Sequence, residues 1–196
     1  MQNNAKTLGF FNKTEQNITN IYNEKKSSIS SLMPKFIEIL YDKVISHNPE
    51  TELIITVALM DEYDVEDKII YNDLKKYRGI AEDYGTYYSC CKDSLNSLDD
   101  IYYNSKKRIL LSINEFYKEE KRLLLSTLTN IPKKPYEIIK ENSDIIIDNI
   151  KYKLEKEIEK HYNEEKICSE DITFCLPIFL CFAFMECKIL EKRPKE

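Results

Sequence analysis

Apolar residues recur every three or four positions along most of this chain, and this spacing places them on one face of an α-helix. The segment after Pro34 is one example, because its apolar positions keep the helical period until Asn48-Pro49 ends it: Phe36, Ile37, Leu40, Val44 and Ile45. The same period predicts further helices, over 65–84, 87–98, 105–128, 136–163 and 169–190. The sequence therefore predicts an all-α fold, arranged as a compact multi-helix bundle.

Polar residues and glycine indicate where several of these helices begin and end. Asp64 is placed to cap the helix that starts at the next residue, and Gly85 stands where a C′ glycine would end it. Ser169 is placed to cap the last helix. Asn142-Ser143 is a break signal, so the segment that surrounds it forms one long amphipathic helix or two.

The length of 196 residues fits a single domain. Residues 1–12 are predicted as a flexible N-terminal tail, and 13–30 as a polar, marginal helix. The stretch 129–135 is an internal linker, so 13–196 are predicted as one all-α domain. The apolar run 53–60 fits a buried strand or a buried helix, and the helix is favoured because no second strand candidate exists.

The C-terminal segment 172–190 has two interpretations. It carries no charge from Ile172 to Met185, and a helix of that length spans about 21 Å at about 1.5 Å per residue. A bilayer core is about 30 Å thick, and only extension past Glu186 and Lys188 reaches that length. We therefore favour a buried central helix and keep a membrane anchor over 172–190 as the alternative.

Composition argues against catalysis and against nucleic-acid binding. Three glycines and two histidines leave few residues for phosphate loops, nucleophile elbows or acid–base chemistry. The 29 basic and 34 acidic residues give a net charge of −5, and the two signs alternate along the chain. We expect no enzyme activity, no cofactor and no nucleic-acid partner.

The six cysteines are expected to be free thiols in the cytoplasm, because the N-terminal residues lack the apolar stretch of a secretory signal. Four of them lie near the C-terminus at spacings that do not suit zinc, and we expect them to be buried small hydrophobes: Cys168, Cys175, Cys181 and Cys187. His47 and His161 have no catalytic motif around them. No metal site is expected.

The stretch 70–85 carries a tyrosine, a leucine, an aromatic residue and an Ala-x-x-x-Tyr-Gly sequence at characteristic spacing: Tyr71, Leu74, Tyr77, Ala81, Tyr84 and Gly85. It resembles the second helix of the poxviral Bcl-like family, and the apolar C-terminal helix resembles that family's buried central helix. The resemblance implies a Bcl-like bundle and a non-enzymatic viral protein. It also implies that the protein binds host signalling or cell-death proteins in the host-cell cytoplasm.

We therefore predict a protein-binding domain that sequesters host innate-immune or apoptotic signalling proteins. The alternatives are a generic helical-bundle adaptor or assembly subunit, and a tail-anchored membrane-associated protein. Tyrosine is enriched where proteins bind, so two tyrosine pairs are the candidate interface: Tyr87, Tyr88, Tyr102 and Tyr103. The sequence names neither the partner nor the oligomeric state.

Overall fold

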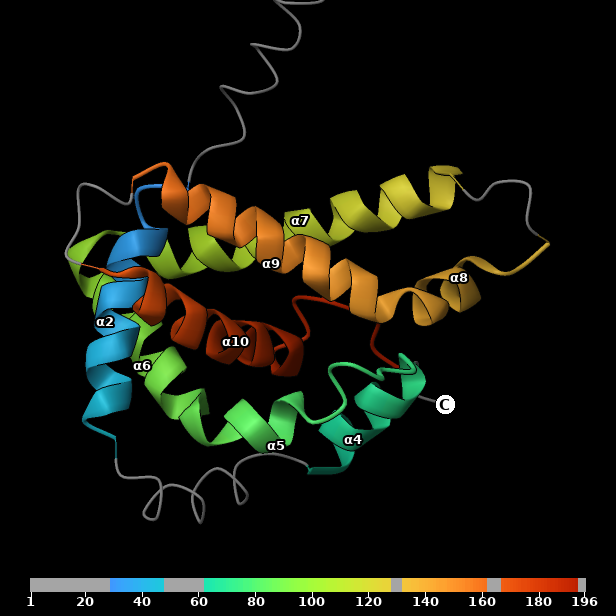
Figure 1. Ribbon diagram of the computed structural model, residues 1–196, viewed down its shortest axis with the longest axis horizontal. Coiled ribbons are helices and arrows are strands. Elements are labelled where there is room, and N and C mark those ends of the chain that lie inside the picture. Colours follow the sequence, from blue (N-terminus) through green and yellow to red (C-terminus); the bar gives the residue numbers. More distant parts are fainter. Residues whose placement is uncertain (1–28, 48–61, 128–131, 162–166, 194–196) are drawn as a thin grey trace, which may run out of the picture.

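The structure of the protein is a computed structural model, and the residues that it describes are 29–47, 62–127, 132–161 and 167–193. Within these ranges every regular element is helical, which confirms the all-α prediction (Figure 1). The elements are α2 (Met33–Ile45), α4 (Glu62–Tyr71), α5 (Ile80–Tyr84), the short 3₁₀-helix η1 (Gly85–Tyr87), α6 (Tyr88–Ile101), α7 (Ser105–Thr127), α8 (Pro135–Glu141), α9 (Ser143–Glu159) and α10 (Ser169–Met185).

Four of the predictions fall wholly or largely outside the described residues. These are the N-terminal tail over 1–12, the marginal helix over 13–30, the apolar helix over 53–60 and the first part of the linker over 129–135. The helix predicted after Pro34 is α2, and the one predicted over 105–128 is α7. Both confirm that apolar spacing located the helices correctly where strong polar breaks flank them.

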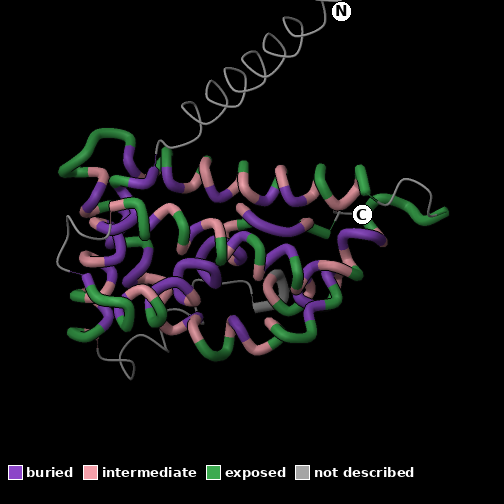
Figure 2. The backbone as a smooth tube through the Cα atoms, turned by 45° about the horizontal axis from the view of Figure 1, so that its top comes forward, coloured by how far each residue is buried: buried purple, intermediate pink, exposed green. Residues whose placement is uncertain are grey.

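Helix α10 lies at the centre of the bundle and packs against α2, α6, α5 and α9 (Figure 1). The residues of its C-terminal half from Ile178 to Phe184 are all buried, so burial extends around the whole circumference of the helix. Figure 2 shows that buried positions gather toward the interior of the molecule. A helix that is apolar on all sides has to be enclosed by others, and this packing encloses it. Helix α10 is therefore the buried central helix that the favoured interpretation of 172–190 predicted. No helix in the described part of the chain is long and apolar enough to cross a membrane.

The boundaries predicted for the last helix were wrong at both ends. The N-cap is Cys168 and not Ser169, because Cys168 is extended and its N–H donates to the Asp171 carboxylate at 2.9 Å. The helix ends at Met185, since Cys187 takes a left-handed φ of 54° and the Lys188 N–H donates to the Ala183 carbonyl. This is a Schellman ending. The chain then turns back toward α4.

The single helix predicted over 65–84 is two helices with a loop over 72–79. Asp73 has a φ of 50°, and its N–H donates to the Ile70 carbonyl while that of Leu74 donates to Ile69. Ile69 and Leu74 are both buried, which completes a Schellman ending for α4. Gly85 has a helical φ of −61° and leads into η1, so its predicted C′ role was also wrong.

The helices after the linker confirm the break at Asn142. Its amide donates to the Ile138 carbonyl, and its own φ of −118° separates α8 from α9. Helix α9 then runs back along α7 in the opposite direction (Figure 1). Between them the buried Glu120 carboxylate receives Lys153 at 2.5 Å and Asn149 at 2.7 Å, so a satisfied polar cluster fixes the pairing of these helices.

Lys68 of α4 is an unusual core residue, because its ammonium group lies inside the protein with an exposed fraction of 4%. It donates to the carbonyls of Phe184 and, at 3.0 Å, Ile189, and it lies 4.3 Å from the centre of the Phe184 ring. Burial lowers the pKa of Lys68 to about 8. One buried amine therefore holds the end of α10 and the chain that follows it.

Candidate functional site

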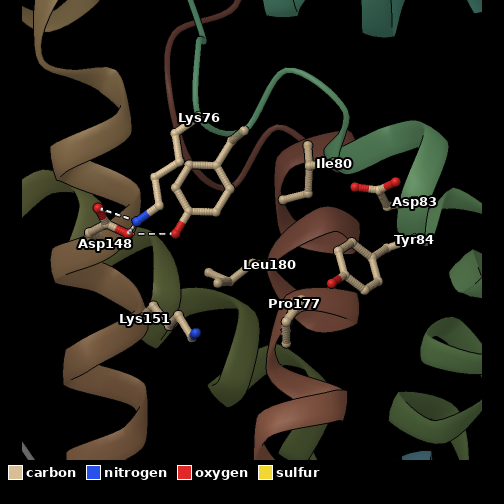
Figure 3. A pocket seen from close by; sticks show the side chains of 9 residues that line it. Lys76, Ile80, Asp83, Tyr84, Asp148, Lys151, Pro177 and Leu180 are labelled. Atoms are coloured by element: carbon tan, nitrogen blue, oxygen red, sulfur yellow. Dashed lines mark hydrogen bonds and ion pairs between the residues drawn. The ribbon is translucent and has the colours of Figure 1, made fainter.

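A surface pocket of about 290 Å³ opens beside α10, between the loop over 72–79, α5 and α9 (Figure 3). Its walls combine charged and aromatic side chains, and its floor is apolar. The lining residues are Lys76, Tyr77, Ile80, Asp83, Tyr84, Asp148, Lys151, Pro177 and Leu180. They come from segments that are far apart in the sequence, so the pocket exists only in the folded chain.

Two carboxylates of α9 position the loop that forms one wall. Asp144 accepts the backbone N–H groups of Lys75, Lys76 and Tyr77 at 3.1–3.3 Å. One turn later Asp148 receives the Lys76 ammonium and the Tyr77 hydroxyl, both at 2.6 Å (Figure 3). Residues four apart share one face of a helix, which lets both carboxylates face the same loop.

The hydrogen bonds at this wall also set the protonation of its groups. Partial burial alone would raise the pKa of Asp148, but hydrogen bonds from Lys76 and Tyr77 outweigh it and hold that pKa below its ordinary value. Burial, together with the Asp148 carboxylate, raises the pKa of Tyr77 above its ordinary value. At neutral pH this wall therefore presents an ionised Asp148 carboxylate and a protonated Tyr77 phenol.

The floor of the pocket is apolar and continues along α10. Leu180 and Ile80 are buried beneath it, whereas Pro177 and Tyr84 are half-buried at its edge. One turn earlier on α10, Phe174 is 40% exposed, and its ring meets that of Tyr87 edge-on at 6.1 Å. We call the surface formed by Phe174, Pro177, Tyr84 and Tyr87 the α10 face.

The four tyrosines predicted as an interface do not lie together. The hydroxyl of Tyr88 donates to Glu186, and its ring lies 5.0 Å from that of Phe182, so Tyr88 is half-buried against the core. Tyr87 belongs to the α10 face. The other pair lies beyond the far end of α6, where Tyr103 is 88% exposed and the hydroxyl of Tyr102 accepts a hydrogen bond from Lys35 at 3.0 Å. A binding role for these tyrosines stays a prediction.

The cysteines divide into two classes by burial. Cys175 and Cys181 are buried as expected, but Cys168 and Cys187 are exposed, because they flank α10 instead of lying within it. Burial raises the pKa of the Cys175 and Cys181 thiols to about 12, which keeps them protonated. No group of three His, Cys, Asp or Glu side chains that could hold a metal ion occurs among the described residues.

Sequence reasoning missed Asp148, which lines the pocket, Asp144, which holds the loop of its wall, and Phe174 on the neighbouring α10 face. The spacing of the two aspartates on α9 was visible, but their partners lie 67–72 positions earlier in the chain. Phe174 stands in an apolar run where every position looked equally buried. Only the packing of neighbouring helices shows which part of that run is open.

No protein-family model matches this chain, and it has no significant similarity to a curated protein or to a solved structure.

Proposed function

We propose that this protein is a non-enzymatic protein-binding domain that sequesters a host innate-immune or apoptotic signalling protein, as a viral modulator does. The observation that carries the proposal is the α10 face. Phe174 belongs to the core helix, yet it is 40% exposed beside the open pocket. Exposed apolar surface next to a pocket is typical of sites that a partner covers. Aromatic residues are also enriched in protein interfaces.

The chemistry of the surrounding residues favours an amphipathic helix as the bound segment. Its apolar ridge would lie on Phe174 and Pro177, which are one turn apart on α10. Charges of both signs flank the pocket, with Lys151 on α9 and Asp83 on α5 (Figure 3). An acidic residue on one side of the partner helix and a basic residue on the other would complement them.

The viral part of the proposal rests on the resemblance of 70–85 to the poxviral Bcl-like family. That stretch forms the end of α4, the loop over 72–79, α5 and the first residue of η1, and it supplies five residues that line the pocket: Lys76, Tyr77, Ile80, Asp83 and Tyr84. Two of the residues that carry the resemblance, Tyr77 and Tyr84, thus line the pocket. A membrane anchor at 172–190 is not part of the proposal, because extracting α10 would remove the centre of the core.

The test compares Phe174→Asp with Tyr152→Asp, a matched change at an aromatic residue of α9 that is 59% exposed and lies outside the pocket. Each protein is used to capture signalling proteins from host-cell extract, and each captured protein is then purified and titrated directly. Phe174→Asp should weaken that binding by at least about tenfold, because burying an unpaired carboxylate in an apolar interface is costly. Tyr152→Asp should bind as the unchanged protein does.

Two outcomes contradict the proposal. One is the absence of any host signalling protein whose direct binding depends on Phe174. The other is a partner that Tyr152→Asp abolishes and Phe174→Asp does not, which would favour the adaptor or assembly-subunit alternative through the outer face of α9. Thermal unfolding of both variants, followed by circular dichroism, separates lost binding from lost folding.

A further inference from the structure

Residues 188–191 follow α10 and pass close to α4, and side chains of other helices bind their main chain (Figure 1). We call these residues the terminal segment. Asn72, directly after α4, donates its amide to the Glu191 carbonyl at 2.8 Å and accepts the Glu191 N–H at 3.1 Å. Asn114 of α7 donates to the Lys188 carbonyl at 2.8 Å. Main-chain groups are common to all peptides, so these contacts suit a peptide segment in general.

The terminal segment also presents two apolar side chains and one carboxylate to the bundle. Ile189 and Leu190 are buried, with exposed fractions of 0% and 4%. The Glu191 carboxylate accepts the Tyr117 hydroxyl at 2.5 Å and the Lys121 ammonium. The side chains that bind the segment come from the end of α4 and from α7, and we call them the α4–α7 site: Lys68, Asn72, Asn114, Tyr117 and Lys121.

The backbone of this region is strained at two positions. Cys187 and Leu190 take left-handed φ values of 54° and 62°, which cost conformational energy for residues other than glycine. The strain at Cys187 comes from the reversal that brings the terminal segment back from α10. A peptide of another protein is not connected to α10, so it can make the same contacts without that strain.

We propose that the α4–α7 site is a peptide-binding site, and that the terminal segment occupies it as an intramolecular competitor of a partner protein. The bound segment of the partner has two adjacent apolar residues followed by an acidic residue, as Ile189, Leu190 and Glu191 have. Its main chain pairs with the two asparagines of the site, and its carboxylate pairs with Tyr117 and Lys121.

The intramolecular segment regulates this binding. It reduces the apparent affinity for the partner to the fraction of molecules in which the site is open. A second copy of this chain would bring the same residues and gain no contact over the intramolecular segment, so we assign the site to a different protein. The proposal is independent of the α10 face, because none of the five side chains of the α4–α7 site lines the pocket beside α10.

The experiment titrates the full chain with a fluorescent peptide of residues 186–193 in reducing buffer and follows the anisotropy. Glu191→Ala in the protein should raise the affinity for the peptide about tenfold, because it weakens the intramolecular segment and leaves the site intact. Glu115→Ala, which removes a surface carboxylate paired with Lys118 on α7, should leave the affinity unchanged. Cys187→Gly should lower the affinity about fivefold, since glycine relieves the strain of the reversal and tightens the intramolecular segment.

Changes in the peptide test where it binds. A peptide with alanine at the position of Glu191 should bind the Glu191→Ala protein about tenfold more weakly than the unchanged peptide does. Carbodiimide coupling should join the glutamate of the unchanged peptide at that position to Lys121, which peptide mass spectrometry detects. Thermal unfolding followed by circular dichroism checks that each variant is folded, and Glu191→Gln gives the same test if Glu191→Ala does not fold.

Three results would overturn the proposal. The first is a peptide affinity that is no higher for the Glu191→Ala protein than for the unchanged protein. The second is coupling of the peptide to other lysines but not to Lys121, because the peptide would then bind elsewhere. The third is a dimer of the unchanged protein that the peptide dissociates, since the segment of a second copy would then be the occupant.

Discussion

The reversals of the chain after α4 and after α10 use the same backbone ending but are held by opposite kinds of side chain. Asp73 and Cys187 take left-handed φ values of 50° and 54°, and each ends its helix in the same pattern of hydrogen bonds. The first reversal is held from outside by Asp144 and Asp148 of α9, near solvent. The second is held from inside by the buried Lys68. The contacts of Lys68 are buried, whereas those of Asp144 and Asp148 lie near solvent. We therefore expect the contacts of Lys68 to contribute more to the free energy of unfolding.

The largest effect is expected at Lys68. In Lys68→Ala the Ile189 carbonyl loses its buried donor, the Phe184 carbonyl keeps only its bond from the Cys187 N–H, and the side-chain stem leaves a cavity. An unsatisfied buried carbonyl costs about 1–3 kcal/mol and the lost packing adds to it, so we expect the free energy of unfolding to fall by about 2–4 kcal/mol. Urea denaturation followed by circular dichroism measures this change.

The matched control is Lys75→Ala in the loop after α4. The Lys75 side chain is 78% exposed and lies 3.7 Å from Asp73, an ion pair of little consequence in water. Its replacement should change the free energy of unfolding by less than about 0.5 kcal/mol. If Lys68→Ala lowered the free energy of unfolding no more than Lys75→Ala does, the contrast between the buried contacts of Lys68 and the exposed contacts of the loop after α4 would be wrong.

Lys68 should also make the free energy of unfolding depend on pH in alkaline solution. Burial lowers the pKa of Lys68 to about 8 in the folded protein, whereas the unfolded lysine titrates near 10.4. Between these values the unfolded chain binds a proton that the folded protein does not, so this group adds stability as the pH rises from 8 to 10. Its contribution should increase by roughly 2 kcal/mol, with a slope of at most about 1.4 kcal/mol per pH unit.

The measurement has to compare the unchanged protein with Lys68→Met. Burial raises the pKa of Cys91, Cys175 and Cys181, and these thiols lower stability as the pH rises, because they ionise more readily in the unfolded chain. Both proteins share that opposing effect, and the difference between their unfolding free energies isolates Lys68. A difference that stays constant from pH 8 to 10 would contradict the assignment.

The sequence was sufficient for the fold class, because apolar residues recur with the helical period along most of the chain. It was insufficient within 65–84, since apolar spacing reports which side chains are buried and not whether the backbone stays helical. Leu74 and Ile80 are buried and Tyr77 packs on the core, although they follow the end of α4, so the helical period continues through a loop. The residue with a left-handed φ there is Asp73, and not the glycine that usually marks the end of a helix.

The candidate site was less predictable than the fold for a related reason. Its wall depends on Asp144 meeting a loop 67–69 positions away, and the end of α10 depends on Lys68 meeting Phe184, 116 positions away. A lysine in an amphipathic helix is normally a surface residue, so its pattern gave no indication of a buried amine. Such pairings arise from tertiary packing, which local periodicity does not contain.

A smaller loss than that from Lys68→Ala is expected for the contacts of Asp144 with the loop after α4. In Asp144→Ala the backbone N–H groups of Lys75, Lys76 and Tyr77 lose their acceptor, but they lie where water can replace it. We expect a loss of only about 1 kcal/mol, because net contributions of partly solvated hydrogen bonds are small. Hydrogen exchange should nevertheless accelerate at these three amides while the amides of α10 stay protected. Asp144→Asn keeps an acceptor oxygen and should recover part of the protection. If Asp144→Ala lowered the free energy of unfolding as much as Lys68→Ala does, the contacts of the two residues would be equally strong, and burial would not determine their contribution.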